Sequence, residues 1–319
     1  MLLIRNEKIF EKTICYDDYW VFAHSRQERL RSSVFGFTPQ ADPIIDRFKF
    51  TNCYRALDRT SQYLISNIIQ NNSYNEQDTF FRIIIFKTFN KIETWLALEE
   101  EFGTIDLTTF DEIRYAQALD KLRANNRKIY SAAYIMPSGK SEFGSQRKHE
   151  NNLRMISLML KLNLQHRVWE STNLEENYKL LLNIPTLGNF LAYQYAIDLG
   201  YSRYSNTNEN QFVVAGPGAA RGIKKCFPTA RPEDYSYIIE HMTNTQSFEF
   251  DRLGIKFNHL KNRNLQLIDC QNLFCELDKY LRVKRPEFGN PGARIKQKYK
   301  KNPTPINYEF PHHWNTHLE

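Results

Sequence analysis

The sequence predicts a mainly α-helical fold with a basic C-terminal tail. Apolar residues recur at helical spacing through long stretches, among them residues 57–69 and 265–281. Residues 178–198 have the pattern of a helix, a tight turn and a second helix. A hydrophobic content of 41% and a charged content of 25% are ordinary for a globular protein, so these helices can enclose a core.

The helices are expected to form one domain, because no internal repeat and no linker interrupts them. We predict a helical domain over residues 45–285, with an N-terminal extension, 1–44, packed on it. Residues 286–319 are then the basic tail.

The turn within residues 178–198 predicts an anion site. Pro185 cannot continue the first helix, Gly188 can adopt backbone angles that other residues avoid, and Asn189 can cap the second helix. The free N–H groups at that helix start attract anions, and in a DNA-binding chain the anion is a backbone phosphate. We therefore predict DNA contacts at Thr186, Gly188 and Asn189. The pattern Leu-x-x-Pro-x-x-Gly-x-x-x-Ala resembles the helix-hairpin-helix of DNA glycosylases, although an ordinary αα-hairpin is the alternative.

The positive charge is concentrated near the C-terminus. The formal net charge is +7, and residues 282–301 contain eight Lys or Arg and a single acid, Glu287, so the rest of the chain sums to zero. We call residues 282–301 the basic strap. A neutral body with such a segment favours attraction to a polyanion, and we predict DNA contacts at Lys296 and Lys298. The alternative is a solvated, disordered tail.

Several function classes are excluded or disfavoured. The five Cys are scattered and no signal peptide is evident, which favours free thiols in a reducing cytoplasm. No apolar run is long enough to cross a membrane, and no Cys or His grouping predicts a metal or another cofactor. Gly139-Lys140-Ser141 is not a Walker A loop, because Tyr134 occupies the position that requires a glycine.

Polar residues within predicted helices suggest a pocket. Arg55 and Asp58 share one face of the helix within residues 48–71. We predict one long helix over residues 80–102 that is apolar almost all round, so Lys87 and Asn90 need partners in a core. Solvated faces are the usual alternative.

Two later stretches add candidates. The Gly216-Pro217-Gly218 turn lets the backbone approach a ligand before a helix that contains Arg221, so we predict DNA contacts at Gly216, Gly218 and Arg221. Taken alone, the turn is better explained as simple chain punctuation. Within residues 265–281, Asp269, Asn272, Glu276 and Lys279 fall on one polar face. A solvated face is the alternative for these four.

Six motifs together resemble one family, in their order and joint occurrence. They are TNCYRALDR (51–59), RIIIFKTFN (82–90), AYIM (133–136), LGNFLAYQ (187–194, followed by Asp198-Leu199), GPGA (216–219) and CELDKY (275–280). They are similar to the alpha-glutamyl/putrescinyl thymine pyrophosphorylases, which are close to the helical domain of 5-hydroxymethyl-deoxyuridine DNA kinases. The resemblance implies a helix-hairpin-helix DNA glycosylase-like fold and a role in hypermodified phage DNA.

The first hypothesis for function is a DNA glycosylase of phage defence. It would flip a substituted 5-hydroxymethyl pyrimidine out of double-stranded DNA, as a monomer without a cofactor, and hydrolyse the bond to the sugar. Glycosylases usually carry a catalytic Asp beyond the hairpin glycine, but residues 213–219 contain no acid. The carboxylate would then be Asp198, Asp269 or Glu276. Residues predicted to contact the base or its substituent are Arg55, Asp58, Lys87, Asn90 and Lys279.

Two other hypotheses remain open. One is a transferase that joins an amino acid or amine to an activated hydroxymethyl group of DNA, with displacement of pyrophosphate. The other is a DNA-binding module without catalysis.

Overall fold

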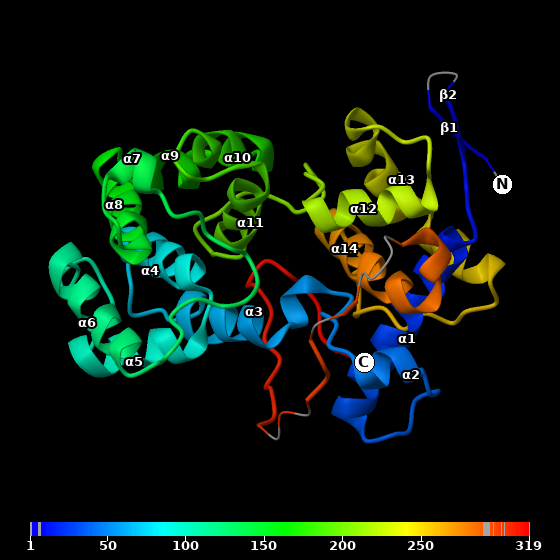
Figure 1. Cartoon of the computed structure of the whole chain (residues 1–319), viewed down its shortest axis with the longest axis horizontal. Coiled ribbons are helices and arrows are strands. Elements are labelled where there is room, and N and C mark those ends of the chain that lie inside the picture. Colours follow the sequence, from blue (N-terminus) through cyan, green and yellow to red (C-terminus); the bar gives the residue numbers. More distant parts are fainter. Residues whose placement is uncertain are drawn as a thin grey trace. The chain divides into compact units, whose positions relative to one another are not determined.

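The computed structural model describes residues 2–5, 8–289, 294–295, 297–300, 302 and 304–318. Apart from one short pair of strands, the elements in these residues are helices, which confirms the predicted mainly α-helical class (Figure 1). No described helix is both long and apolar enough to cross a membrane.

The chain divides into two compact units. The terminal unit comprises Met1–Asp58, Val213–Tyr308 and Asn315–Glu319, and the central unit comprises Arg59–Phe212 and Glu309–Trp314. In the sequence, each of the two segments of the central unit is therefore flanked on both sides by segments of the terminal unit. The predicted spans 1–44, 45–285 and 286–319 do not coincide with these units and stay predictions.

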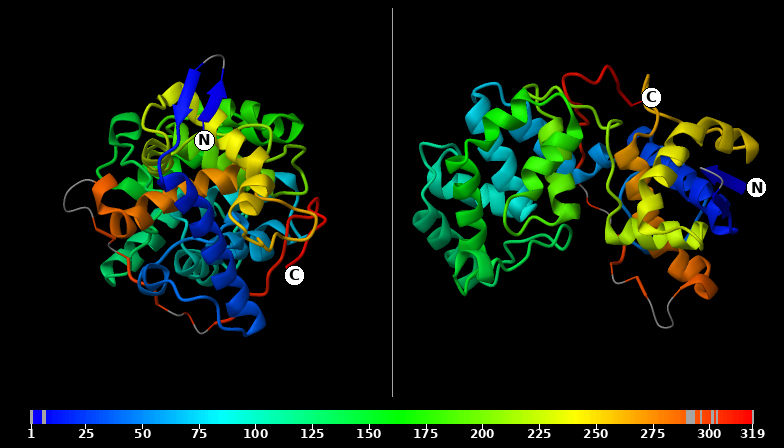
Figure 2. Two further views of the ribbon diagram at one scale, coloured as in Figure 1. Left: turned by 90° about the vertical axis from the view of Figure 1, so that its right-hand side faces the viewer. Right: turned by 90° about the horizontal axis from the view of Figure 1, so that it is seen from above.

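The terminal unit begins with strands β1 (Leu2–Arg5) and β2 (Lys8–Glu11), which pair antiparallel ahead of the first helix (Figure 2). Its α-helices are α1 (Cys15–Phe35), α2 (Pro43–Arg47), α12 (Pro217–Cys226), α13 (Tyr235–Arg252) and α14 (Leu267–Lys284). Single 3₁₀ turns lie at Arg55–Leu57, Pro232–Asp234 and Pro286–Phe288. Aromatic side chains of α1 fill much of the core; the Tyr19 ring, for example, lies 4.6 Å from Phe274 of α14.

Helices α12 and α14 pack with almost no space between them. A Cβ atom at Gly222 would overlap the carbonyl oxygen of Phe274, and one at Gly218 would overlap the Cys275 thiol. Glycine at both positions therefore allows the two helix backbones to approach closely. Gly218 was predicted to let the backbone approach DNA, but the neighbour that it approaches in the structure is α14.

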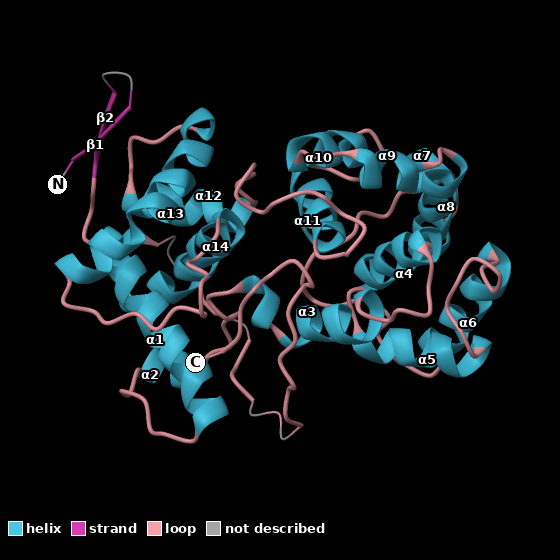
Figure 3. Ribbon diagram, turned by 180° about the vertical axis from the view of Figure 1, so that it is seen from behind, coloured by secondary structure: helices cyan, strands magenta, loops and turns pink. Residues whose placement is uncertain are grey.

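The central unit contains the helices that Figure 3 shows around α4. They are α3 (Arg59–Tyr63), a π-helical stretch (Leu64–Ile69), α4 (Glu76–Phe89), α5 (Ile92–Phe102), α6 (Glu112–Ala124), α7 (Lys140–Phe143), α8 (Lys148–Lys161), α9 (Leu164–Glu170), α10 (Leu174–Leu182) and α11 (Asn189–Gly200). Every residue of α4 from Thr79 to Phe89 is buried, which agrees with a helix that is apolar almost all round.

The single helix predicted over residues 80–102 is wrong, because the chain breaks at Asn90. Asn90 adopts a left-handed conformation, with φ of 47°, and its N–H caps α4 through the Phe86 carbonyl. Asparagine tolerates this region better than most residues, so it can end one helix and let α5 start in a new direction.

The helix–turn–helix predicted within residues 178–198 is present as α10, the turn 183–188 and α11. Two details of its prediction are wrong. The left-handed residue is Thr186, with φ of 76°, whereas Gly188 has an extended conformation with φ of −76°. Gly188 is the N-cap of α11, and the side chain of Asn189 instead accepts a hydrogen bond from the Tyr178 hydroxyl at 3.2 Å.

Candidate functional site

The predicted site residues gather mainly in two places, one in each unit. The first, which we call the Thr51 cluster, consists of Thr51, Asn52, Asp58, Glu276 and Lys279 in the terminal unit. The second, the Lys87 cluster, consists of Lys87, Tyr134 and Asp198 in the central unit.

Buried Arg26 of α1 fixes the loop that carries Thr51. Its guanidinium donates to the carbonyls of Thr51 and Phe50 at 3.0 and 3.1 Å, and to the Asn52 side chain at 3.1 Å. Three hydrogen bonds from a planar group hold the loop in one conformation. The backbone N–H groups of that loop are left to bind carboxylates.

Those N–H groups orient two carboxylates. The Thr51 N–H donates to Glu276 Oε2 at 3.1 Å, and the Asn52 N–H donates to Asp58 Oδ1 at 2.9 Å. Lys279, one helical turn after Glu276 on α14, pairs with Glu276 Oε1 at 2.6 Å. Sequence segments far apart thus contribute two acids and one cation to a single cluster.

The environment of Asp58 alters the proton affinity of its carboxyl group. Burial of the carboxyl group disfavours its charged form and raises the pKa of Asp58 to about 7. The negative charge of Glu276 also acts to raise the pKa of Asp58. The Asn52 N–H and the cations Arg26 and Arg55 oppose that rise. Residue 58 as a whole is half-buried, and a carboxyl with a pKa of about 7 is present in both protonation states near neutral pH.

Asp269 connects the same loop to the start of α14. Its Oδ1 accepts the Arg55 N–H at 2.7 Å, and its Oδ2 accepts the Gln266 N–H at 3.0 Å. The Arg55 side chain is buried. Both carboxylate oxygens of Asp269 therefore accept hydrogen bonds from backbone N–H groups, and these bonds hold residues 51–58 in position.

The Lys87 cluster is more deeply buried. Lys87 Nζ lies 2.7 Å from Asp198 Oδ2, and the two side chains are 1% and 3% exposed. The same ammonium lies 3.9 Å from the centre of the Tyr134 ring, and this ring stacks on that of Phe190 at 5.9 Å. Tyr134 has a φ of 52°, an unusual conformation for an aromatic residue, and this conformation accompanies its place over the ammonium.

Asn90 fixes the loop that carries Tyr134. Its side-chain amide donates to the Ser131 hydroxyl at 3.3 Å, and the Ser131 N–H donates to the Phe89 carbonyl at 3.0 Å. Lys87 and Asn90 thus belong to one region of the central unit with Asp198, which was predicted separately, although Asn90 acts on the loop and not on the ion pair.

The predicted DNA contacts are distributed over both units. The hairpin turn borders a hollow of about 450 Å³ whose other wall is formed by residues 137–142, so other helices do not bury it. Gly216 is the N-cap of α12, and Arg221 on the same helix is exposed and pairs with Asp278 at 3.0 Å. Lys298 is exposed, while Lys296 lies outside the described residues.

The predicted basic strap is partly neutralised. Arg282 pairs with Asp278 at 2.7 Å, while Lys284 and Arg285 pair with Asp18 at 3.1 and 2.8 Å. Lys298 forms an isolated β-bridge with Phe48, so its backbone is attached to the terminal unit. The charge available to a ligand is therefore smaller than the sequence count suggests.

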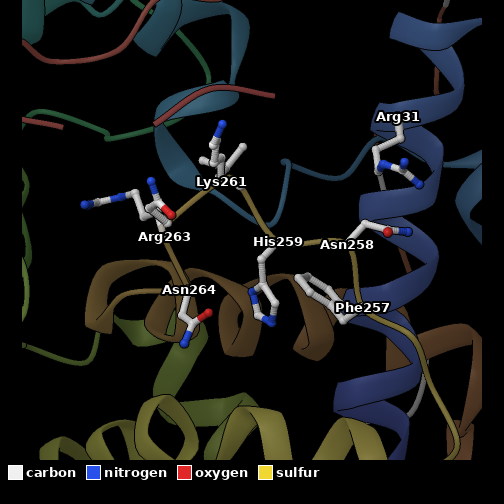
Figure 4. Close-up of a pocket in the computed structure, with 9 residues that line it drawn as sticks. Arg31, Phe257, Asn258, His259, Lys261, Arg263 and Asn264 are labelled. Atoms are coloured by element: carbon white, nitrogen blue, oxygen red, sulfur yellow. The ribbon is translucent and has the colours of Figure 1, made fainter. Parts of the chain in front are cut away.

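A separate hollow of about 670 Å³ is lined by Arg31 and residues 257–264, and Figure 4 shows its lining. The Tyr54 hydroxyl donates to the Arg263 carbonyl at 2.8 Å and accepts the Leu260 N–H at 3.2 Å. Lys261 and Arg263 point away from His259, and burial lowers the pKa of His259 to about 4.

Sequence reasoning missed Arg26 as a determinant of the site. A signal was present, because Phe22, Ala23 and Leu30 lie three or four residues from Arg26 and make its helix face apolar. A charged residue in the middle of an apolar face needs buried partners.

Comparison with known proteins identifies the family. The family model described as "5-hmdU DNA kinase, helical domain" matches residues 13–290. A 5-hmdU DNA kinase of Bacillus phage SP10 is 26% identical over 279 residues, which is 82% of this chain and 43% of the relative. The chain therefore spans less than half the length of that relative. No solved structure matches.

These comparisons correct the first functional hypothesis. The relative is named as a DNA kinase, which is a transferase, so the interpretation as a DNA glycosylase, a hydrolase or a defence enzyme is wrong. The predicted connection with phage and modified bases agrees with that name. Because the family model matches most of this chain, the chain belongs to the family described as the helical domain of 5-hmdU DNA kinase.

Proposed function

We propose that this chain acts on double-stranded DNA containing 5-hydroxymethyl-deoxyuridine and joins an amine or amino acid to the activated hydroxymethyl group. The name of the phage relative supports modified DNA as the substrate. The resemblance to thymine pyrophosphorylases supports an amine as the incoming group. This reaction is a transfer, in line with the class of the relative.

One observation carries the proposal: the Thr51 cluster holds an acid with a pKa of about 7, Asp58, beside the Glu276–Lys279 pair. A general base works best when its pKa lies near the working pH. Motif residues 51–59 and 275–280 meet in this cluster, so the resemblance and the geometry indicate the same place.

The proposed step needs no cofactor, because each bond that forms is matched by a bond that breaks. The nitrogen of a neutral amine forms a bond to the exocyclic methylene carbon of the base, and the carbon–oxygen bond to pyrophosphate breaks. Pyrophosphate leaves with the bonding electron pair, and the proton lost by the new ammonium passes to the Asp58 carboxylate. Lys279, 27% exposed, stabilises the charge of the leaving group, while Glu276 and Asp269 keep Lys279 and the loop in position.

DNA would be held outside this cluster. A base within a duplex must be flipped out before its substituent can react. We assign backbone phosphates to the turn around Thr186, Gly188 and Asn189, and to the α12 start at Gly216. Exposed Lys298 adds salt-dependent affinity. A single copy of the chain is the proposed active species.

A second candidate is a DNA-recognition domain for a kinase reaction that other residues catalyse. It is favoured by the name of the relative and by the 43% of that protein that this chain spans. Within this chain, Gly139-Lys140-Ser141 has Tyr134 in place of the Walker glycine. The domain would then bind the modified base without transferring an amine.

Nucleoside mass spectrometry separates the candidates. Duplex DNA with pyrophosphorylated 5-hydroxymethyl-deoxyuridine is incubated with the protein and either glutamate or putrescine. The proposed transferase gives an amine adduct and free pyrophosphate, and Asp58→Asn abolishes both, whereas Asp251→Asn on the exposed side of α13 does not. Tight binding of 5-hydroxymethylated DNA with no adduct for any amine would establish the recognition domain and refute the transferase.

A further inference from the structure

A basic pocket of about 550 Å³ in the central unit has no role in the proposed function. It lies between the chain that follows α6 and the start of α8, and no Asp or Glu is among its lining residues. Its cationic lining residues are Arg123, Arg127, Lys128, Arg147 and Lys148. Sequence reasoning missed this group because its members come from two separate stretches, residues 123–128 and 147–148.

Nearby acids neutralise only part of this charge. Asp120 pairs with Arg123 at 3.6 Å and also with Arg147, which has a second partner in Glu150. In the part of the chain that the structure describes, no carboxylate lies within ion-pair distance of the other three cations. Those cations are Arg127, Lys128 and Lys148.

Lys148 is the most constrained of the three. Its ammonium lies 4.3 Å from the centre of the Tyr130 ring, and Tyr130 is itself fixed by a 2.7 Å hydrogen bond from its hydroxyl to Asn152 Oδ1. Burial lowers the pKa of Lys148. An ammonium that loses water without gaining a carboxylate is less stable than an exposed one, and a bound anion would compensate for that loss.

We propose that this pocket binds phosphate groups of an anionic ligand, with Lys148 and Lys128 as the principal contacts and Arg127 at the rim. Among the described residues, the Arg127 guanidinium donates one long hydrogen bond, 3.5 Å, to the Glu93 carbonyl, so it can turn to a ligand. Three cations around one hollow suit a ligand with more than one phosphate, either consecutive phosphates of a DNA strand or free pyrophosphate.

The inference goes beyond the proposed function, since it concerns binding and needs no reaction at the Thr51 cluster. The test uses the whole chain with two probes: a duplex oligonucleotide followed by fluorescence anisotropy at several salt concentrations, and inorganic pyrophosphate followed by calorimetry. The variant is Lys128→Gln with Lys148→Gln. The charge-matched control is Lys121→Gln with Lys161→Gln, on exposed positions of α6 and α8 where Lys121 pairs with Glu101.

Loss of duplex affinity in the first variant, with the slope of log K against log salt reduced by about 0.9 for each lost phosphate contact, assigns the pocket to the DNA backbone. A tenfold or larger loss of pyrophosphate affinity with unchanged duplex binding assigns it to the free anion. If both probes bind the two double variants equally well, the proposal is refuted. Lys128→Gln alone, at an exposed position, keeps the test valid if the change at Lys148 impairs folding.

Discussion

Lys87 of α4 and Asp198 of α11 form an ion pair of 2.7 Å with both side chains almost completely excluded from water. Neither residue is near the other in the sequence, so the two helices place the charges together. A buried pair is costly to break, because the partner that remains keeps its charge without compensation.

We expect Asp198→Asn to lower the free energy of unfolding by about 3–5 kcal/mol, as for other broken buried pairs. Chemical denaturation at neutral pH measures the change. Glu93→Gln, which removes the exposed partner of Lys91, is the control and should cost less than about 1 kcal/mol. Equal stability of the two variants would show that the buried pair contributes nothing to the fold.

Asp58 should make both activity and stability depend on pH. Its pKa is about 7 in the folded state and higher than in the unfolded chain, so the folded state binds the extra proton. Stability from this group is therefore present in acid and is lost as the pH rises towards 7. Asp58→Asn should remove that loss, which denaturation at pH 5 and pH 8 can measure.

The rate of the proposed transfer should follow the opposite course, because the base must be ionised. We expect the rate to rise with pH through about 7 and then level off, since the pKa of Asp58 is about 7. Asp251→Asn should retain this profile, as Asp251 is exposed on α13. A profile that is flat between pH 6 and 8 in the wild-type protein would rule out Asp58 as the base.

The close packing of α12 on α14 predicts a strong effect of one methyl group. Gly222→Ala would force the new Cβ into the Phe274 carbonyl, and we expect a loss of about 1–3 kcal/mol or more in thermal or chemical unfolding. Gly188→Ala is the control, because its Cβ would meet nothing within 4 Å and its φ is −76°. Loss of the glycine N-cap of α11 should cost this control no more than about 1 kcal/mol. Similar losses at both positions would contradict the close packing.

The cations of the strap should contribute unequally to DNA affinity. Lys298→Gln removes an exposed charge and should reduce the salt slope of binding by about 0.9. Lys284→Gln removes a charge that Asp18 already neutralises, so we expect a smaller change. Anisotropy titrations of one duplex at several salt concentrations compare them, and a larger effect of Lys284→Gln would refute this distinction.

The sequence by itself determined the helical class, the helix–turn–helix of α10 and α11, and the identity of most residues in both clusters. It could do so because helical spacing of apolar residues is local, and because Pro185 ends a helix wherever it occurs. Lys87 could be selected as a polar residue on a helix that is otherwise apolar. Asp58 was selected as part of a polar helix face, but in the structure it lies between the 3₁₀ turn Arg55–Leu57 and the start of α3.

Only the tertiary structure decided which of these residues meet. Lys87 forms an ion pair with Asp198, whereas Asp58 lies near Glu276 in the other unit. Both carboxylate oxygens of Asp269 accept hydrogen bonds from backbone N–H groups. It also decided that Thr186, and not Gly188, takes the left-handed conformation of the turn. Ion pairing, burial and the resulting pKa values depend on distances between segments that are remote in the chain, and the local pattern of a sequence does not contain those distances.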